Sequence, residues 1–144
     1  MICTFFGHRN TPATIDKLLR ELLTELIEHH GADEFDVGNQ GNFDAMVRRQ
    51  LEKLSKSYSI NYSVVLAYLP DKNAEPNHCP VYPEGIETVP RKFAIHYRNK
   101  WMLNKADTVI CYVSQPSSGA GQFVELAEKQ GKRIFNLNNL YKEN

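Results

Sequence analysis

The sequence predicts an α/β protein with a Rossmann-like, doubly wound and mostly parallel sheet of about five strands, covered by helices on both faces. Two observations support this fold class. Short apolar, strand-like runs alternate along the chain with longer segments of helical periodicity. Polar or glycine-rich turns follow the strand-like runs, and ligands of such sheets bind where these turns gather. We expect residues 1–144 to form a single domain.

The first half of the chain alternates strand and helix. Its apolar and β-branched runs predict strands over residues 2–6, 34–37 and 63–69. A first helix is expected from Thr11, as N-cap before Pro12, to about residue 30, where Gly31 ends it. Apolar residues at helical spacing predict a second helix over residues 42–54.

The second half begins with a proline-rich segment over residues 71–89. A connection of this length predicts either a lid or specificity loop or a disordered segment. The same patterns then predict a helix over residues 91–104, a strand over 108–113, a helix that begins at Gly119 and a last strand over 133–137.

The charge balance limits the classes of partner. Seventeen Lys and Arg residues offset seventeen Asp and Glu residues, so no overall field favours a polyanion or a membrane surface. No apolar run approaches the roughly 20 residues that span a bilayer. We therefore expect a cytoplasmic protein without a membrane partner, and nucleic acid is not the expected ligand.

The three cysteines do not form a metal-ligand pattern. Cys3 and Cys111 lie in apolar strand-like runs, where cysteine usually acts as a small buried hydrophobe. Cys79 lies beside His78 in the proline-rich segment, which raises the alternative of a metal site, but the spaced ligands of a structural zinc site are missing. We expect no metal and no cofactor, and the scattered, odd cysteine count indicates a reducing compartment.

The turns that follow the strands predict a ligand site. Residues 7–9, 38–41, 68–71 and 114–121 would meet at the carboxyl edge of a parallel sheet. The turn Ser117-Ser118-Gly119-Ala120-Gly121 also opens a helix, so that its backbone N–H groups and the helix dipole favour an anion. With Arg98 on one element and Glu125 on another, this arrangement predicts a nucleotide site.

Several segments resemble the SLOG superfamily, the Rossmann-like group named after DprA and the Lonely Guy (LOG) enzymes. LOG-like proteins carry a Met-His-x-Arg-Lys-x-x-Met helix and a Pro-Gly-Gly-x-Gly-Thr-x-x-Glu turn, to which residues 96–102 (HYRNKWM) and 116–125 (PSSGAGQFVE) are similar. Residues 6–9 (FGHR) and 38–44 (GNQGNFD) are closer to the bacterial and phage YpsA-like branch of unknown function.

The resemblance implies two functions. LOG enzymes remove the base from a nucleoside 5′-monophosphate with an essential Arg and Glu, which match Arg98 and Glu125, whereas other members sense nucleotide-derived signals such as ADP-ribose without turnover. Here the signature Lys is Asn99 and the Gly-Gly pair is Ser117-Ser118. We expect binding of a nucleoside phosphate or an ADP-ribose- or NAD-like ligand, as sensor or sponge; the alternative is a phosphoribohydrolase.

The candidate site residues follow from these considerations. Arg98 and Glu125 are the candidate catalytic pair, and their alternatives are a surface arginine and a solvated helix carboxylate. Relatives in the superfamily often dimerise, so a homo-oligomer is also considered. The candidate ligand-binding residues are Gly7, His8, Arg9, Gly38, Asn39, Asp44, Ser117, Ser118, Gly119 and Gly121.

Overall fold

A computed structural model of the chain describes residues 1–69 and 80–143, and the side chains of 1–69 and 80–140. The described part contains one six-stranded sheet in which every neighbouring pair of strands is parallel. The spatial order is β4-β3-β2-β1-β5-β6. The strands are β1 (Ile2–Gly7), β2 (Glu34–Val37), β3 (Asn61–Val65), β4 (Pro80–Val81), β5 (Thr108–Tyr112) and β6 (Arg133–Asn136).

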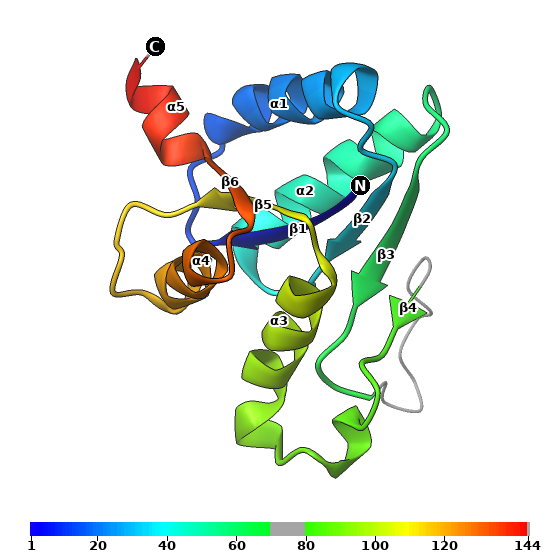
Figure 1. The fold of residues 1–144 in the computed structure, drawn as a ribbon, viewed down its shortest axis with the longest axis vertical. Coiled ribbons are helices and arrows are strands. Elements are labelled where there is room, and N and C mark those ends of the chain that lie inside the picture. The colour runs from blue at the N-terminus through cyan, green and yellow to red at the C-terminus, as the bar shows by residue number, and fades with distance from the viewer. Residues whose placement is uncertain (70–79, 144) are drawn as a thin grey trace.

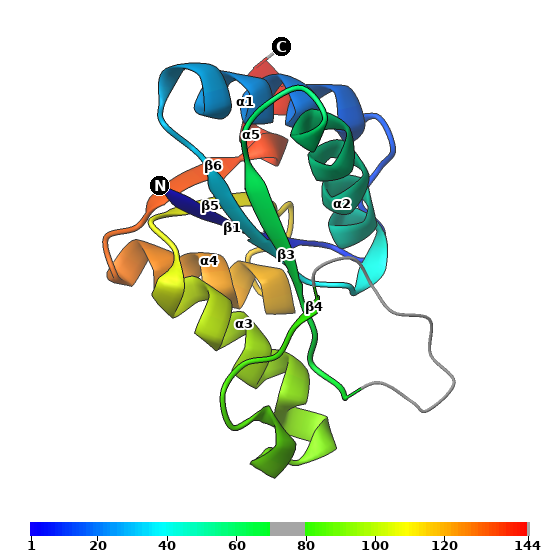
Figure 2. The same cartoon turned by 90° about the vertical axis from the view of Figure 1, so that its right-hand side faces the viewer.

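Helices cover both faces of this sheet (Figures 1 and 2). On one face lie α1 (Ile15–His29), α2 (Gly41–Ser55) and α5 (Leu137–Glu143), and on the other lie α3 (Ala94–Lys105) and α4 (Gly119–Lys129). Two clusters of buried apolar residues fill the space between the layers. Leu23, Phe43 and Leu51 belong to the first cluster, and Met102 and Phe123 belong to the second. The predicted Rossmann-like α/β class is therefore confirmed, with one strand more than expected.

The strand order reverses beside β1 (Figure 1). The chain adds β2, β3 and β4 on one side of β1, and then crosses through α3 to add β5 and β6 on the other side. The connections that leave β1 and β5 therefore run to opposite faces of the sheet, and this separation opens a crevice at their carboxyl ends.

Some predicted boundaries are wrong. The first helix begins at Ile15 rather than near Thr11, because the backbone N–H and the hydroxyl of Thr11 both donate to the carbonyl of His8 and close a separate turn. The strand predicted over 63–69 covers Asn61–Val65 instead. Helix α5, which follows β6, was not predicted.

The proline-rich segment is described only in part. Residues 70–79, with His78 and Cys79, lie outside the described residues, and the lid, disorder and metal interpretations placed there go untested. From residue 80 onward the segment contains the short strand β4 and a 3₁₀ turn over Ile86–Thr88. A second 3₁₀ turn over Arg91–Phe93 precedes α3, which begins three residues later than predicted.

Two further expectations concern burial and membrane association. Cys3 and Cys111 are completely buried in the sheet, as predicted, and burial raises the pKa of each thiol to about 12.

In the described part of the chain, no helix combines the length and apolar character needed to cross a membrane.

Gly7 is required by packing at the end of β1. A Cβ atom on Gly7 would lie 2.2 Å from Cγ of Phe43, because the Phe43 ring on α2 rests directly on the strand backbone. Phe43 is completely buried and belongs to the first apolar cluster. The absent side chain therefore brings α2 close to the edge at which β1 ends.

We predict that Gly7→Ala destabilises the protein by about 1–3 kcal/mol, since the added methyl group overpacks the contact with Phe43. Urea unfolding followed by circular dichroism measures the change. Gly119→Ala is the matched control, because a Cβ atom there meets nothing within 4 Å, and its expected effect is within about 0.5 kcal/mol. Equal losses in both variants would contradict the packing explanation.

Candidate functional site

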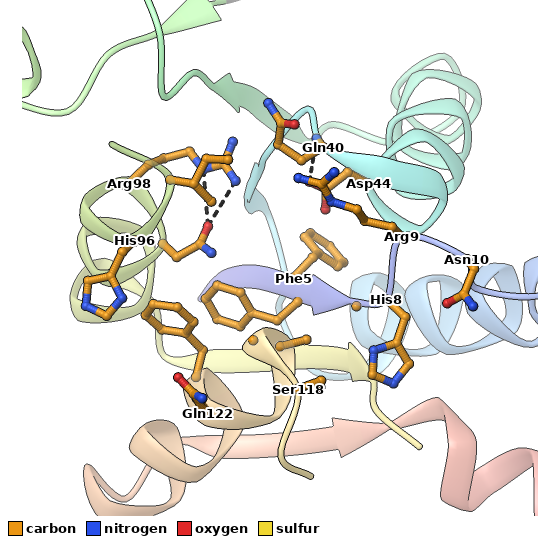
Figure 3. Close-up of a pocket in the computed structure, with 17 residues that line it drawn as sticks. Phe5, His8, Arg9, Asn10, Gln40, Asp44, His96, Arg98, Ser118 and Gln122 are labelled. Carbon is orange, nitrogen blue, oxygen red and sulfur yellow. Dashed lines mark hydrogen bonds between the residues drawn. The ribbon is translucent and has the colours of Figure 1, made fainter. Parts of the chain in front are cut away.

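A cleft of about 480 Å³ lies at the carboxyl end of β1, where the strand order reverses (Figure 3). Four chain segments form its walls: the end of β1 with the following turn, the start of α2 with the residue before it, the first half of α3, and the first turns of α4. The lining residues are Phe5, Phe6, Gly7, His8, Arg9, Asn10, Gln40, Asp44, Ile95, His96, Arg98, Asn99, Ser118, Gly119, Ala120, Gln122 and Phe123.

One end of the cleft is aromatic. The rings of Phe6 and Phe123 stack with centroids 5.3 Å apart, and the exposed imidazole of His96 lies 5.1 Å from Phe123. Ile95 contributes an aliphatic side chain from the same turn of α3. Phe6 and Phe123 are themselves buried, so the accessible surface at this end comes from the exposed His96 and the half-buried Ile95, which lie over the two phenyl rings.

The start of α4 offers backbone donors to the cleft. Ser118 is the N-cap, and its hydroxyl oxygen accepts from the backbone N–H of Gly121 at 3.1 Å. The N–H groups of Gly119 and Ala120 are left without an acceptor in the described part of the chain. Gly119 lies against open space, and these N–H groups and the dipole of α4 favour an anion at this point.

Arg9 and Asn10 are exposed at the other end of the cleft (Figure 3). The backbone carbonyl of Arg9 accepts from the N–H of Asn42 at 2.9 Å, which fixes this turn against the start of α2. The contact needs Gly41, whose φ is +81° and whose Cβ atom would lie 2.7 Å from Cα of Arg9. The Arg9 backbone is therefore anchored while its side chain is accessible to a ligand.

His8 joins the two strands that flank the cleft. Its Nε2 accepts from the backbone N–H of Ser114, in the turn after β5, at 3.0 Å. An Nε2 that accepts a hydrogen bond carries no proton, so the imidazole is neutral in this arrangement. Burial lowers the pKa of His8 below its ordinary value, which also favours the neutral form.

Arg98 is buried rather than exposed, with 2% of its surface accessible. Its guanidinium donates to Oδ1 of Asn99 through Nε and Nη2, at 3.2 and 3.1 Å. Nη1 donates to Oδ1 of Asn39 at 3.2 Å and to the carbonyl of Val65 at 3.4 Å. Burial lowers the pKa of Arg98, and the charge of Asp44 opposes this shift. Neither a surface arginine nor a freely accessible phosphate clamp describes this residue.

Asp44 lies on α2 close to Arg98 and is also buried. Its Oδ2 accepts from the backbone N–H of Gln40 at 2.9 Å. Burial raises the pKa of Asp44, whereas this hydrogen bond and the charges of Arg98 and Arg48 lower it. Gly38 makes room for both side chains, because its Cβ atom would lie 2.8 Å from Oδ2 of Asp44 and 2.9 Å from Cζ of Arg98.

Helix α3 is also attached to the sheet at its far end. Nζ of Lys105 lies 3.4 Å from Oδ2 of the buried Asp36 on β2, and 3.6 Å from Oε1 of Glu34. Burial raises the pKa of Asp36, and Lys105 opposes the shift. Arg98 and Lys105 therefore hold α3 against the sheet at two points.

Glu125 does not reach the cleft, which is a correction to the expected Arg98–Glu125 pair. Its side chain is 64% exposed and lies 3.5 Å from Nζ of Lys129, one turn further along α4. The buried residues Phe123, Val124 and Ala127 fix the inward face of α4. Because Glu125 lies off that face, its carboxylate points away from the sheet. Glu125 is therefore the solvated helix carboxylate that the sequence analysis gave as the alternative to a catalytic residue.

The other candidate residues divide into two groups. Gly7, His8, Arg9, Asp44, Arg98, Ser118 and Gly119 line the cleft together. Gly38, Asn39, Ser117 and Gly121 do not line it. Asn39 accepts a hydrogen bond from Arg98, and Gly38 leaves the space that the Arg98 guanidinium occupies. Gly121 permits the turn before α4, because a Cβ atom there would lie 2.2 Å from the carbonyl oxygen of Pro116.

Sequence reasoning missed several lining residues. Gln40 and Ala120 lie within turns that were expected at this edge, but they were not singled out. The lining residues outside those turns that were not candidate residues are Phe5, Phe6, Asn10, Ile95, His96, Asn99, Gln122 and Phe123. Two simple signals point to some of them. Asn10 extends a turn already identified, and Asn99 lies four residues after Ile95, so the two share one face of α3.

No protein-family model and no curated protein matches this sequence. Within residues 1–69 and 80–140, no three His, Cys, Asp or Glu side chains are grouped so that they could hold a metal ion.

We predict that the free energy of unfolding decreases as the pH is lowered below 7, because the His8–Ser114 hydrogen bond requires a neutral imidazole. The folded-state pKa of His8 is lowered, so the unfolded chain takes up this proton first as the pH falls through about 6.5. The contribution of neutral His8 to the free energy of unfolding is therefore complete above about pH 6.5 and is lost as the pH falls towards the lower pKa that His8 has in the folded protein. Urea midpoints measured from pH 8 to pH 5 should decrease more for the wild type than for His8→Gln. Parallel pH profiles would contradict this assignment.

Proposed function

We propose that the cleft binds a nucleotide or a nucleotide-derived ligand, such as a nucleoside phosphate or an ADP-ribose- or NAD-like molecule, and that the protein acts as a sensor or sponge. The observation that carries the proposal is the division of the cleft between an anion-attracting part and an aromatic part. A volume of about 480 Å³ is typical of small-molecule sites.

The anion-attracting part suits a phosphate group. Arg9 supplies an accessible guanidinium, and the N–H groups of Gly119 and Ala120 supply backbone donors under the dipole of α4. The Ser118 hydroxyl is already engaged, because it donates to the carbonyl of Gln115 at 2.7 Å and accepts from the N–H of Gly121, so the donors at this cap are the backbone N–H groups. These groups come from two segments more than a hundred residues apart, which supports a site built for one charged ligand.

The aromatic part suits a base. A planar ring at this end would stack on the exposed imidazole of His96 and contact Ile95, with the buried Phe123 ring behind them, and stacking on aromatic side chains stabilises bases of every kind. Gln122 is exposed at the same end and offers both donors and an acceptor. A nucleotide would therefore lie across the cleft, with its phosphate near Arg9 and its base near α3.

Binding without cleavage is favoured over a phosphoribohydrolase. Breaking an N-glycosidic bond calls for a carboxylate that touches the ribose or protonates the departing base. Among the described residues that line the cleft, Asp44 is the only carboxylate, and it is 8% exposed and accepts from Gln40. The Glu125 carboxylate, which matches the LOG glutamate, is directed away from the cleft.

The proposal also includes membership of the SLOG superfamily. The parallel sheet and the position of the cleft at the reversal of strand order are compatible with this resemblance. The segment 38–44, which is similar to the YpsA-like branch, contributes Gln40 and Asp44 to the lining.

We predict that Arg9→Ala weakens ligand binding by about tenfold to a hundredfold, since a hydrogen bond to a charged group contributes about 1.5–3 kcal/mol. Thermal unfolding is measured with AMP, IMP, ADP, ADP-ribose and NAD, because a ligand at about 100 times its Kd stabilises the folded state by about 2.7 kcal/mol. Arg49→Ala is the matched control, as Arg49 is exposed on α2 and does not line the cleft. If none of these ligands raises the melting temperature of the wild type, the proposed function is wrong.

We predict that incubation with the same nucleotides releases no free base, as measured by chromatography, because the described part of the cleft holds no accessible carboxylate. Glu125→Ala should leave ligand binding unchanged. Base release that Glu125→Ala abolishes would favour the phosphoribohydrolase instead.

A further inference from the structure

We infer that Arg98 is a positioning residue that fixes the side-chain amide of Asn99 as a hydrogen-bond donor in the cleft, so that the site prefers a carbonyl oxygen over an amino group at position 6 of a purine or position 4 of a pyrimidine. The inference rests on the proposed nucleotide site. It assigns to Arg98 a role other than contact with a phosphate.

The orientation of the Asn99 amide follows from the hydrogen bonds of Arg98. A guanidinium has donors and no acceptor, so the atom of Asn99 that faces Nε and Nη2 must be the oxygen Oδ1. Two donors hold that oxygen, at 3.2 and 3.1 Å. The Nδ2 group is thereby turned away from Arg98, and in the described part of the chain no acceptor takes its hydrogens.

Arg98 itself has little freedom to move. It is buried, and Nη1 is held by Asn39 and by the carbonyl of Val65. The guanidinium also fills the space left by Gly38, whose Cβ atom would lie 3.0 Å from Nη1. The Asn99 amide is therefore fixed by a rigid partner, and rotating it by 180° would place its own N–H groups against the N–H groups of Arg98.

Asn99 lies at the aromatic end of the cleft. It is half-buried, lines the cleft, and follows Ile95 and His96 by four and three residues on α3, so the three share one face of that helix. Figure 3 shows His96 and Arg98 on α3 at one side of the cleft, with His8, Arg9 and Asn10 at the opposite side. A base stacked near His96 would present its edge to the Asn99 amide.

The fixed donor discriminates between base edges. The carbonyl oxygen of hypoxanthine, guanine or uracil accepts a hydrogen bond from Nδ2, whereas the amino group of adenine or cytosine presents a second donor. Two donors that face each other are both left unpaired, and a site built around a hydrogen bond rejects such an analogue. Gln122 is exposed and can turn to suit either edge, so the selection falls to Asn99.

The test compares pairs of nucleotides that differ at this group. Calorimetric titration of the wild type should give about tenfold tighter binding of IMP than of AMP, and of UMP than of CMP. Asn99→Asp keeps an acceptor for Arg98 and replaces the donor by a carboxylate oxygen, so this preference should disappear or reverse. Asn104→Asp makes the same chemical change on α3 outside the cleft and should leave the preference unchanged.

The role of Arg98 is read from the ratio of affinities, which a merely structural residue would not change. Arg98→Lys keeps the charge and loses the planar set of donors, so the Asn99 amide is released and the IMP:AMP ratio should approach one. If Arg98→Lys does not fold, the Asn99→Asp ratio decides the inference. Equal binding of IMP and AMP by the wild type, or an unchanged ratio in Asn99→Asp, would overturn it. Absence of binding by every nucleotide would overturn the proposed function as well.

Discussion

The arrangement of the cleft depends on one buried charge, the guanidinium of Arg98. A buried charge is tolerated only where hydrogen bonds replace its lost hydration. Its partners Asn39 and Val65 follow β2 and end β3, 59 and 33 residues earlier in the chain. Satisfying this one side chain therefore brings the first turns of α3 against the ends of two strands. It holds one wall of the cleft in place before any ligand arrives.

The opposite wall is built by different means. The turn after β1 is fixed by main-chain contacts and by close approaches at Gly7 and Gly41, and the start of α4 is fixed by its Ser118 cap. These walls present backbone donors and an accessible Arg9, whereas α3 presents aromatic and amide groups. Because both walls stand on the same parallel sheet, a ligand bound as proposed would meet a preformed site, and little free energy would be lost to ordering it.

Much of the fold could be predicted because its signals are local. The apolar periodicity of α1, α2 and α4 and the β-branched runs of the strands need no knowledge of distant residues. Strand β4 has only two residues and is defined by its pairing with Val64 and Val65 of β3, so no local sequence pattern predicts it. Thr11 looks like a helix cap in sequence, but the carbonyl of His8 takes both of its donors.

The site was harder to predict than the fold. Turns that follow strands identified Gly7, His8 and Arg9, because the end of a parallel strand can be read from the strand itself. The burial of Arg98 depends on partners far away in the sequence, which neither spacing nor composition contains. Glu125 was assigned from a motif, whereas the phase of α4 set by Phe123 and Ala127 directs it outward.

The space beside Gly38 has a consequence for how this protein can diverge. The Arg98 guanidinium and the Asp44 carboxylate occupy the volume that a side chain at position 38 would need. A larger residue at position 38 is compatible only with a shorter one at position 98 or 44. We therefore expect these three positions to co-vary among relatives. A homologue with alanine at position 38 should carry a shorter residue at position 98 or 44, and where the arginine is the one replaced, the fixed amide at position 99 is lost with it.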